Sequence, residues 1–361
     1  ILIKPFKEHI NRDLFFINYK NINITQQLEK YLNNKKYDGI ISNFWYTPNN
    51  YGALLTAYAI QQIFRNKGLD YRLLNFNPYK HKKKYKTSDA KKFAEKYLYL
   101  THEIRNKKDL KNLNSYTDNF VVGSDQVFRD WYLSKRFEIS LFPYTDFSKK
   151  RIAFSASFGT DDINIGKEMI PIYSKCLKRF DSITVREVSG VDICKNTLGV
   201  NAEQLLDPVF LIDKNIYDNL IEYNTTIYKG KIVCYILDLS REFQNKLNEI
   251  GKISGKEVVN IANKNYPMTE FLTAIRDCEF FITDSFHGTC FALLYHTPFL
   301  ALKNKDRGSA RFDSLIKTFN IEKAFITEKK DITFENMSKQ IFDWYKIDDI
   351  IYKESGDIYE W

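Results

Sequence analysis

The residues best suited to chemistry in this chain stand at the ends of apolar runs. The segment "ITDSFHG" places Asp284, Ser285 and His287 between the apolar runs "CEFFIT" and "TCFALLYH", in a chain with only five histidines. An imidazole exchanges a proton near neutral pH, and a nearby carboxylate can accept or direct a proton. His287 is therefore a candidate proton carrier, and Asp284 is a candidate partner.

Three further segments share this layout of an apolar run beside polar residues. Ser124 and Asp125 lie in "FVVGSDQVF", Arg186 lies in "SITVRE", and Asn50 and Gly52 lie in "NNYGALLTAYAI". A glycine-containing turn at a helix start can offer backbone N–H groups to an anion, and arginine pairs with phosphate or carboxylate through two parallel hydrogen bonds. These residues predict an anion-binding site next to proton-transfer groups.

Each segment also has a purely structural interpretation. Asn50 can cap the next helix, Ser124 or Asp125 can cap another, and Arg186 and Glu187 can form an exposed pair at a helix start. A histidine at a strand end is more often a core residue. The functional interpretation is favoured because all four segments would meet at one edge if the apolar runs are strands of parallel sheets.

The elements that would position these residues alternate between apolar runs and helical patterns. Continuous apolar runs separated by helices are typical of parallel sheets covered on both faces. Strands are predicted at 37–44, 71–76, 119–124, 151–157, 182–187, 231–237, 256–261, 278–285 and 298–303. Helices are predicted near 53–67, 165–180, 241–253 and 269–276. The sequence therefore predicts an α/β fold built from two units.

The two units are joined by "LLDPVFLIDKNIYDNL", where Pro208 interrupts the alternation. We predict an N-terminal extension at 1–36, a first α/β domain at 37–213, and a second at 214–330. Residues 331–361 are predicted as a C-terminal helical segment, with packing back on the first domain as one option.

Composition limits the class of protein. A chain of 361 residues with 44% hydrophobic content can bury two cores. No run approaches the roughly 18 apolar residues of a transmembrane helix, and the first residues lack the layout of a signal peptide. Five widely spaced cysteines without a CxxC pair predict reduced, buried thiols in a cytoplasmic protein, with no disulfide and no metal site.

The charge of +9 predicts an anionic partner. Many lysines gather in "YKHKKKYKTSDAKKF", from Tyr79 to Phe93. Nucleic acid is disfavoured because no zinc finger, RNA-binding strand motif or helix-turn-helix is present. A solvated loop, an anionic lipid surface and a lipid diphosphate all fit the run. We expect the lysines of 80–86 to promote peripheral contact with an anionic membrane, at its inner face.

Taken in order, five segments resemble the polysaccharide pyruvyl transferase family: "NNYGALLTAYAI", "FVVGSDQVF", "RIAFSASFG", "ITVREVSGVDICKNTLGVNAEQLLDPVFLI" and "FITDSFHGTCFALLYHTPFLAL". The resemblance covers about residues 38–315. It implies a GT-B-like fold, with two Rossmann-like domains facing each other across a cleft. Two residues depart from the family pattern. Phe128 replaces the usual aromatic of "GSDQVW", and Ser285 stands where many members have arginine.

The resemblance also implies an activity. Members of the family move the enolpyruvyl part of phosphoenolpyruvate onto two hydroxyls of a sugar, which gives a pyruvate ketal on capsular, exopolysaccharide or cell-wall glycans. Arg186 and Arg311, the latter in "GSARFDSLI", are the candidates to bind the donor's phosphate and carboxylate. His287 would move protons, and Asp125 or Asp284 would position or deprotonate the hydroxyl.

The implied partners are phosphoenolpyruvate and a sugar acceptor that is either soluble or linked to a lipid diphosphate, and no cofactor is expected. The remaining candidates for substrate binding are Asn50, Gly52, Ser124 and Ser285. Two other functions stay open. One is a nucleotide-sugar glycosyltransferase on the same frame, which the lack of a carboxylate pair for a ribose or metal disfavours. The other is an inactive scaffold protein of polysaccharide assembly, which Ser285 suggests.

Overall fold

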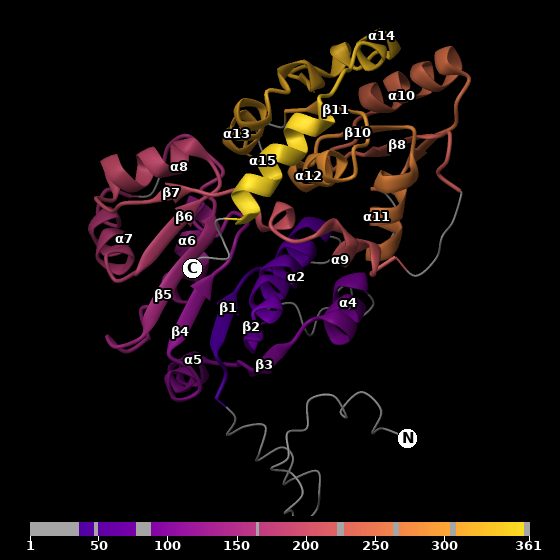
Figure 1. Cartoon of the computed structure of the whole chain (residues 1–361). Helices are drawn as coiled ribbons and strands as arrows, with labels where there is room; N and C mark the ends of the chain where they lie inside the picture. Colours follow the sequence, from indigo (N-terminus) through magenta and orange to yellow (C-terminus); the bar gives the residue numbers. More distant parts are fainter. Residues whose placement is uncertain are drawn as a thin grey trace, which may run out of the picture. The chain divides into compact units, whose positions relative to one another are not determined.

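Two parallel sheets organise the chain, one of seven strands and one of five (Figure 1). The computed structural model describes residues 36–46, 50–76, 88–163, 166–221, 227–262, 267–303 and 308–356. The predicted extension at 1–36 and the lysines of 80–86 therefore lie, apart from Lys36, outside the described residues.

The first sheet has the strand order β3-β2-β1-β4-β5-β6-β7, with all pairs parallel. Its strands are β1 (Gly39–Ser42), β2 (Tyr71–Asn75), β3 (Leu100–Glu103), β4 (Asn119–Val122), β5 (Lys150–Ala156), β6 (Ser182–Val185) and β7 (Glu203–Gln204). The helices between them are α2 (Tyr51–Asn66), α4 (Asp89–Tyr97), α5 (Lys107–Asn112), α6 (Asp130–Leu141), α7 (Ile170–Leu177) and α8 (Val188–Asp192).

The second sheet has the order β12-β11-β10-β8-β9 and is also parallel. Its strands are β8 (Ile232–Tyr235), β9 (Val258–Asn260), β10 (Phe280–Thr283), β11 (Phe299–Leu302) and β12 (Phe325–Ile326). The helices of this part are α9 (Lys214–Asp218), α10 (Arg241–Ser254), α11 (Met268–Asp277), α12 (Phe286–Leu294), α13 (Ala310–Phe319), α14 (Phe334–Ser338) and α15 (Trp344–Gly356).

Strand burial explains why these runs form parallel sheets. All four residues of β1, β8 and β11 are buried, so these strands have no solvated face. Both faces must then be covered by helices, which the βα connections of a parallel sheet supply. Strand order reverses between β1 and β4 in the first sheet and between β8 and β10 in the second. Ligands of such sheets bind at the carboxyl ends of these strands.

The predicted α/β class with two parallel sheets is confirmed. Each predicted strand coincides with an observed one, although β3, β7 and β12 have no predicted counterpart. Strand β3 has the sequence "LTHE" and lies at the sheet edge, so its pattern has no continuous apolar run. The last strand of the first sheet ends at Gln204, and the first strand of the second sheet begins at Ile232. The predicted domain boundaries at 213 and 330 stay predictions.

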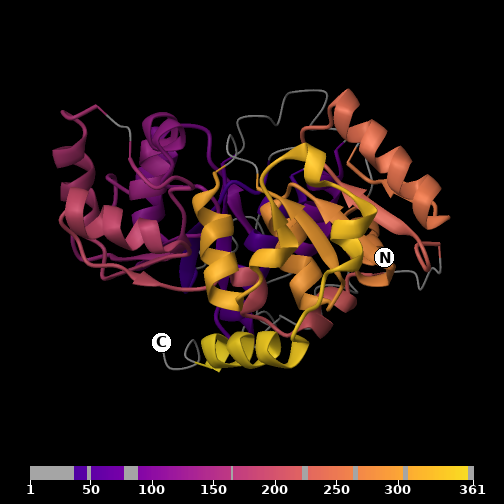
Figure 2. The ribbon, with the colours of Figure 1, turned by 90° about the horizontal axis from the view of Figure 1, so that it is seen from above.

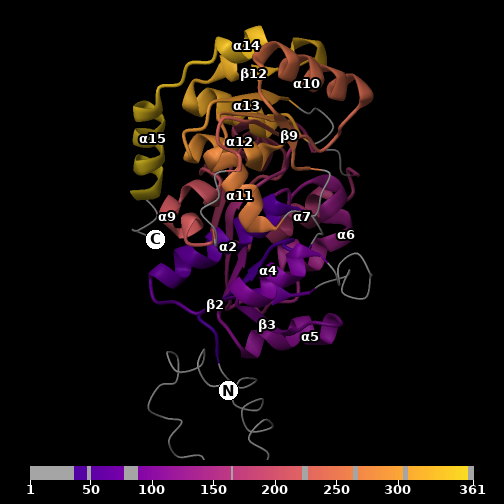
Figure 3. The same cartoon turned by 90° about the vertical axis from the view of Figure 1, so that its right-hand side faces the viewer.

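Helix α15 forms half of the described C-terminal segment, 331–356 (Figures 1 and 3). It packs against α13, buries Ile347, and stacks Trp344 on His296 with ring centroids 5.1 Å apart. The same helix is the yellow one at the lower edge of Figure 2. These contacts attach it to the second part of the chain, and its packing on the first part stays a prediction. Within the described ranges, no helix combines the length and apolar character needed to cross a bilayer.

Candidate active site

Residues from distant segments meet where strands of the first sheet end and where α12 begins. Arg186 follows β6 directly, Ser124 lies two residues after β4, and His287 is the second residue of α12. Asp207 precedes a short turn, Pro208–Phe210, in the link between the two sheets. Hydrogen bonds and ion pairs connect all four side chains.

Arg186 is the cation at the centre of this group. Its side chain is only 1% exposed, and its guanidinium donates to Asp207, to Ser124 Oγ at 3.3 Å and to Asp125 Oδ1 at 3.4 Å. Burial alone would lower its pKa, but the surrounding carboxylates outweigh burial and raise it. The interpretation of Arg186 and Glu187 as an exposed pair is wrong, since both are buried.

Asp207 joins the arginine to the histidine. Its Oδ2 accepts from Arg186 and from Ser124 Oγ (3.1 Å) and lies 3.5 Å from His287 Nε2, while Oδ1 accepts from the N–H of Val209 (3.2 Å). Burial would raise the pKa of this carboxyl, but His287, Arg186 and the Val209 N–H hold it well below its usual range. Sequence reasoning missed this residue. Its signal is a single acid inside the apolar stretch "LLDPVFLI".

His287 reaches from α12 to α2. Its Nε2 is 3.0 Å from Thr56 Oγ1, a second residue that the sequence did not indicate. The imidazole lies directly against Gly52, where an added Cβ would come within 2.1 Å of Nδ1. Gly52 was predicted for its backbone N–H, and the structure gives another reason for a glycine there. Only a residue without a side chain leaves space for the ring.

Replacing Gly52 by alanine is expected to displace His287. The new methyl group would overlap an imidazole that Thr56 and Asp207 hold from its other nitrogen. We expect a loss of about 1–3 kcal/mol in unfolding free energy and about a 10²-fold fall in turnover, measured by urea unfolding and by product formation. Gly356→Ala is the control, because a Cβ there meets nothing within 4 Å. A fully active, stable Gly52→Ala protein would contradict this role.

Asp125 is the most exposed of the charged side chains around Arg186. Its φ of +78° is uncommon for a residue other than glycine, although aspartate tolerates this region better than most. A bridge to Ala156 fixes this backbone next to β5, and the carboxylate stays 17% exposed. Burial would raise its pKa, but Arg186, His287 and Arg311 together lower it. Asp125 is thus an ionised group that a ligand can reach.

Arg311 brings a second cation from α13. Its guanidinium carbon lies 5.0 Å from the ring centre of Phe286, and that of Arg186 lies 4.6 Å from the same ring. Burial and the neighbouring Arg186 lower the pKa of Arg311 to about 10, so it remains charged at neutral pH. Two guanidinium groups, one directly after β6 and one on α13, therefore lie near the same aromatic ring, an arrangement suited to a ligand with two anionic groups.

Glu187 is a buried carboxylate that binds the turn after β5, next to Arg186. It is fully buried, and its Oε1 accepts from Ser157 Oγ (3.0 Å) and from the N–H groups of Phe158 (2.5 Å) and Gly159 (2.9 Å). Its Oε2 is 4.0 Å from Arg186 Nε. Burial raises the pKa of Glu187, and Arg186 with the hydrogen bonds from Gly159 and Ser157 offsets this only in part. Glu187 therefore fixes the turn after β5.

Two predicted substrate-binding residues act as helix caps. Asn50 Oδ1 accepts from the N–H of Ala53 at 3.2 Å and caps α2, and Ser285 Oγ accepts from the N–H of Gly288 at 3.2 Å and caps α12. These bonds satisfy backbone donors that a helix start leaves unpaired. Their contact with substrate stays a prediction.

Asp284 holds the loop after β8. One carboxylate oxygen accepts from the N–H of Leu237 at 2.7 Å and the other from that of Asp238 at 3.2 Å. Both oxygens are thus committed to backbone. Asp284 is buried, whereas the Asp125 side chain is 17% exposed.

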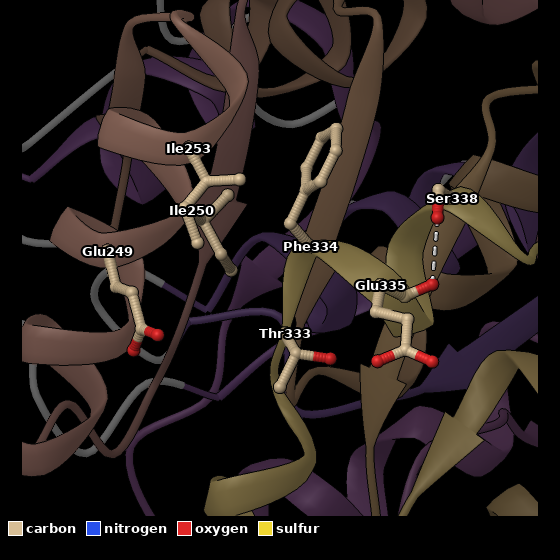
Figure 4. A pocket seen from close by; sticks show the side chains of 7 residues that line it. All are labelled: Glu249, Ile250, Ile253, Thr333, Phe334, Glu335 and Ser338. Atoms are coloured by element: carbon tan, nitrogen blue, oxygen red, sulfur yellow. Dashed lines mark hydrogen bonds between the residues drawn. The ribbon is translucent and has the colours of Figure 1, made fainter.

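Two further features concern metal ions and cavities. In the part of the chain that the structure describes, no three histidine, cysteine or acidic side chains are grouped as a metal ion would need, and all five cysteines are buried. A cavity of about 460 Å³ lies between α10 and α14, where Ile250 and Ile253 lie opposite Phe334, and Glu249 and Glu335 also line it (Figure 4). None of the residues around Arg186 lines it.

Comparison with solved structures identifies similar folds. The chain is similar to UDP-GlcNAc 2-epimerase from Neisseria meningitidis bound to UDP-GlcNAc, with 8% identity, 89% of this chain and 98% of that chain covered, and a TM-score of 0.52. It is also similar to a putative UDP-N-acetylglucosamine 2-epimerase from Listeria monocytogenes, with 11% identity, coverage of 88% and 90%, and a TM-score of 0.50. At such identities the likeness concerns the fold alone, which is the predicted GT-B-like pair of Rossmann-like units.

A comparison with curated proteins gives no match. A family model described as polysaccharide pyruvyl transferase matches residues 50–306, a range that includes Gly52, Arg186, Asp207 and His287. Since this match spans well over half of the sequence, the chain belongs to the polysaccharide pyruvyl transferase family, a family of transferases.

Proposed function

We propose that this protein transfers the enolpyruvyl group of phosphoenolpyruvate to two hydroxyls of a sugar and forms a pyruvate ketal in capsular or exopolysaccharide biosynthesis. The observation that carries the proposal is the joining of His287, Arg186 and Arg311 in one largely buried cluster. Phosphoenolpyruvate has a phosphate and a carboxylate, so two fixed guanidinium groups match its charge.

The reaction needs proton transfer in two directions. A sugar hydroxyl oxygen bonds to C2 of the donor while the electrons of the C2–C3 double bond take a proton at C3. The C2–O bond to phosphate then breaks, the leaving phosphate takes up the proton of the first hydroxyl, and a second hydroxyl oxygen bonds to C2 to close the ketal while its proton returns to the imidazole of His287. His287 supplies the proton to C3, and Asp125, the accessible carboxylate, accepts a hydroxyl proton. The two arginines stabilise the phosphate as it leaves.

Arg311 supports an active enzyme over an inactive scaffold. Ser285 stands where many family members have an arginine, and its hydroxyl is used as a cap. The guanidinium of Arg311 lies beside Phe286, the next residue, and restores a second cation next to Arg186. The missing arginine is therefore compensated from α13.

The proposed acceptor is defined only by its chemical class. We infer a sugar linked to a lipid diphosphate or a soluble glycoside, handled in the cytoplasm with peripheral contact to the inner face of an anionic membrane. That contact rests on the lysines of 80–86, which lie outside the described residues.

Binding of the proposed donor can be tested by its effect on the unfolding free energy of the protein. Phosphoenolpyruvate at ten times its dissociation constant should add about 1.4 kcal/mol to the unfolding free energy, seen as a rise in melting temperature, whereas UDP-GlcNAc should add nothing. Arg311→Met should abolish the rise. Arg276→Met should keep it, because that arginine pairs with Asp277 and Asp218 instead.

Product formation completes this test. Mass spectrometry of candidate glycans should show one added pyruvate ketal, with phosphate released in equal amount. Stabilisation by UDP-GlcNAc alone would support the glycosyltransferase alternative and overturn the proposal.

A further inference from the structure

We propose that His287 exchanges its proton through Nδ1, and that Asp207 is the positioning residue that keeps Nε2 protonated. The starting point is the surroundings of Nε2. It lies 3.0 Å from Thr56 Oγ1 and 3.5 Å from Asp207 Oδ2, and both neighbours are buried. One nitrogen of the ring is therefore directed into the protein.

The two neighbours have different hydrogen-bonding abilities. The hydroxyl of Thr56 can donate or accept, so it is compatible with either tautomer of the ring. An ionised carboxylate can only accept. If Nε2 carried a lone pair, that lone pair would face a buried carboxylate oxygen, and the repulsion would be strong where little water screens it. With a proton on Nε2, the same contact becomes attractive.

Asp207 is held in its ionised form by other groups. Arg186 and Ser124 both donate to the oxygen that faces the ring, and the N–H of Val209 donates to the other oxygen. The pKa of this carboxyl is lowered, first by His287 and also by Arg186 and the Val209 N–H. Nε2 therefore keeps its proton in both the neutral ring and the imidazolium, and the proton that comes and goes is the one on Nδ1.

The position of Nδ1 then locates the reacting atom. It lies over Gly52, in the first turn of α2, a helix of 16 residues that Asn50 caps. A donor molecule that receives a proton from His287 must bring its C3 to this turn. This consequence rests on the proposed function, whereas the tautomer itself does not.

The tautomer is measured directly by NMR of the full chain labelled with ¹⁵N-histidine. Only five histidines contribute, and His287→Asn identifies the signals of His287 by their loss. We expect the neutral ring of His287 to carry its proton on Nε2. A neutral ring protonated on Nδ1 would overturn the proposal, whether or not phosphoenolpyruvate proves to be the donor.

Asp207→Asn tests whether Asp207 is the group that keeps the proton on Nε2 of His287. The amide can donate to Nε2, so the preference for a proton on that nitrogen should disappear, and turnover should fall by about 10²–10⁴ through kcat. Asp213→Asn is the matched control, an exposed acid six residues along that caps α9 through the N–H of Asn215. It should leave both the spectrum and turnover unchanged.

Asp207→Asn also disturbs Arg186, so Thr56→Val provides a second variant if the first does not fold. Asp207 alone should then maintain the proton on Nε2, and the spectrum should keep the parental tautomer. A switch to Nδ1–H in Thr56→Val would assign the effect to Thr56 and overturn the role of Asp207.

Discussion

Asparagine in place of His287 should lower turnover by about 10²–10⁴ while the chain stays folded. The side chain is buried and connects α12 to Thr56 and Asp207, and asparagine keeps a polar group of similar reach. What asparagine cannot do is exchange a proton near neutral pH. Turnover per folded molecule, with folding followed by circular dichroism, measures the effect.

His296→Asn is the matched control for this substitution. His296 bonds to Asp348 and stacks on Trp344, away from the two arginines. It should keep parental turnover. If His287 is instead a core residue, the substitution at 287 would cost about 1–3 kcal/mol of stability and leave turnover per folded molecule unchanged. That result would remove His287 from the mechanism.

Among the substitutions proposed for this site, Arg186→Ala should lower the unfolding free energy the most, by about 3–5 kcal/mol at pH 7. The substitution leaves Asp207 and Glu187 buried and Asp125 largely buried, without the cation that they surround. Urea unfolding measures the loss. Arg276→Ala is the control, because its partly exposed pairs with Asp277 and Asp218 should contribute at most about 1 kcal/mol.

The loss at Arg186 should depend on pH in a defined direction. In the parent, Asp207 has a pKa below its usual value, so its ion pair stabilises the fold above about pH 4 and less as the pH falls. The variant keeps the contacts of Asp207 with His287 and the Val209 N–H, but it lacks the part of this contribution that comes from Arg186. The difference between parent and variant should therefore shrink as the pH is lowered through 4. A difference that is constant with pH, or below about 1 kcal/mol, would contradict the role of Arg186.

The sequence was most informative where a polar residue directly follows an apolar strand. Ser124, Asp125 and Arg186 could be placed together because strand ends of one parallel sheet lie at one edge. His287 could be added because it starts a helix after such a strand. These are local patterns, and they hold regardless of how the two sheets pack.

Asp207, Thr56 and Glu187 could not be predicted in the same way. Thr56 lies in the second turn of a helix whose pattern indicates core, and Asp207 lies in a link without a strand. Their roles come from side chains of distant segments that pack against them. Thr56, for example, contacts His287, which lies 231 positions later in the sequence. Glu187 looked exposed because its three hydrogen-bond donors come from the turn after a neighbouring strand.

The distribution of charge along the chain has a consequence for how the two parts come together. Residues before the second sheet supply three acids around Arg186, namely Asp125, Glu187 and Asp207, so the surroundings of Arg186 carry an excess of negative charge when the acids are ionised. Arg311 and His287 arrive from the later part. Electrostatic attraction between Arg311 and these acids would favour the contact that completes the proposed site, and it would offset part of the negative charge of the first part.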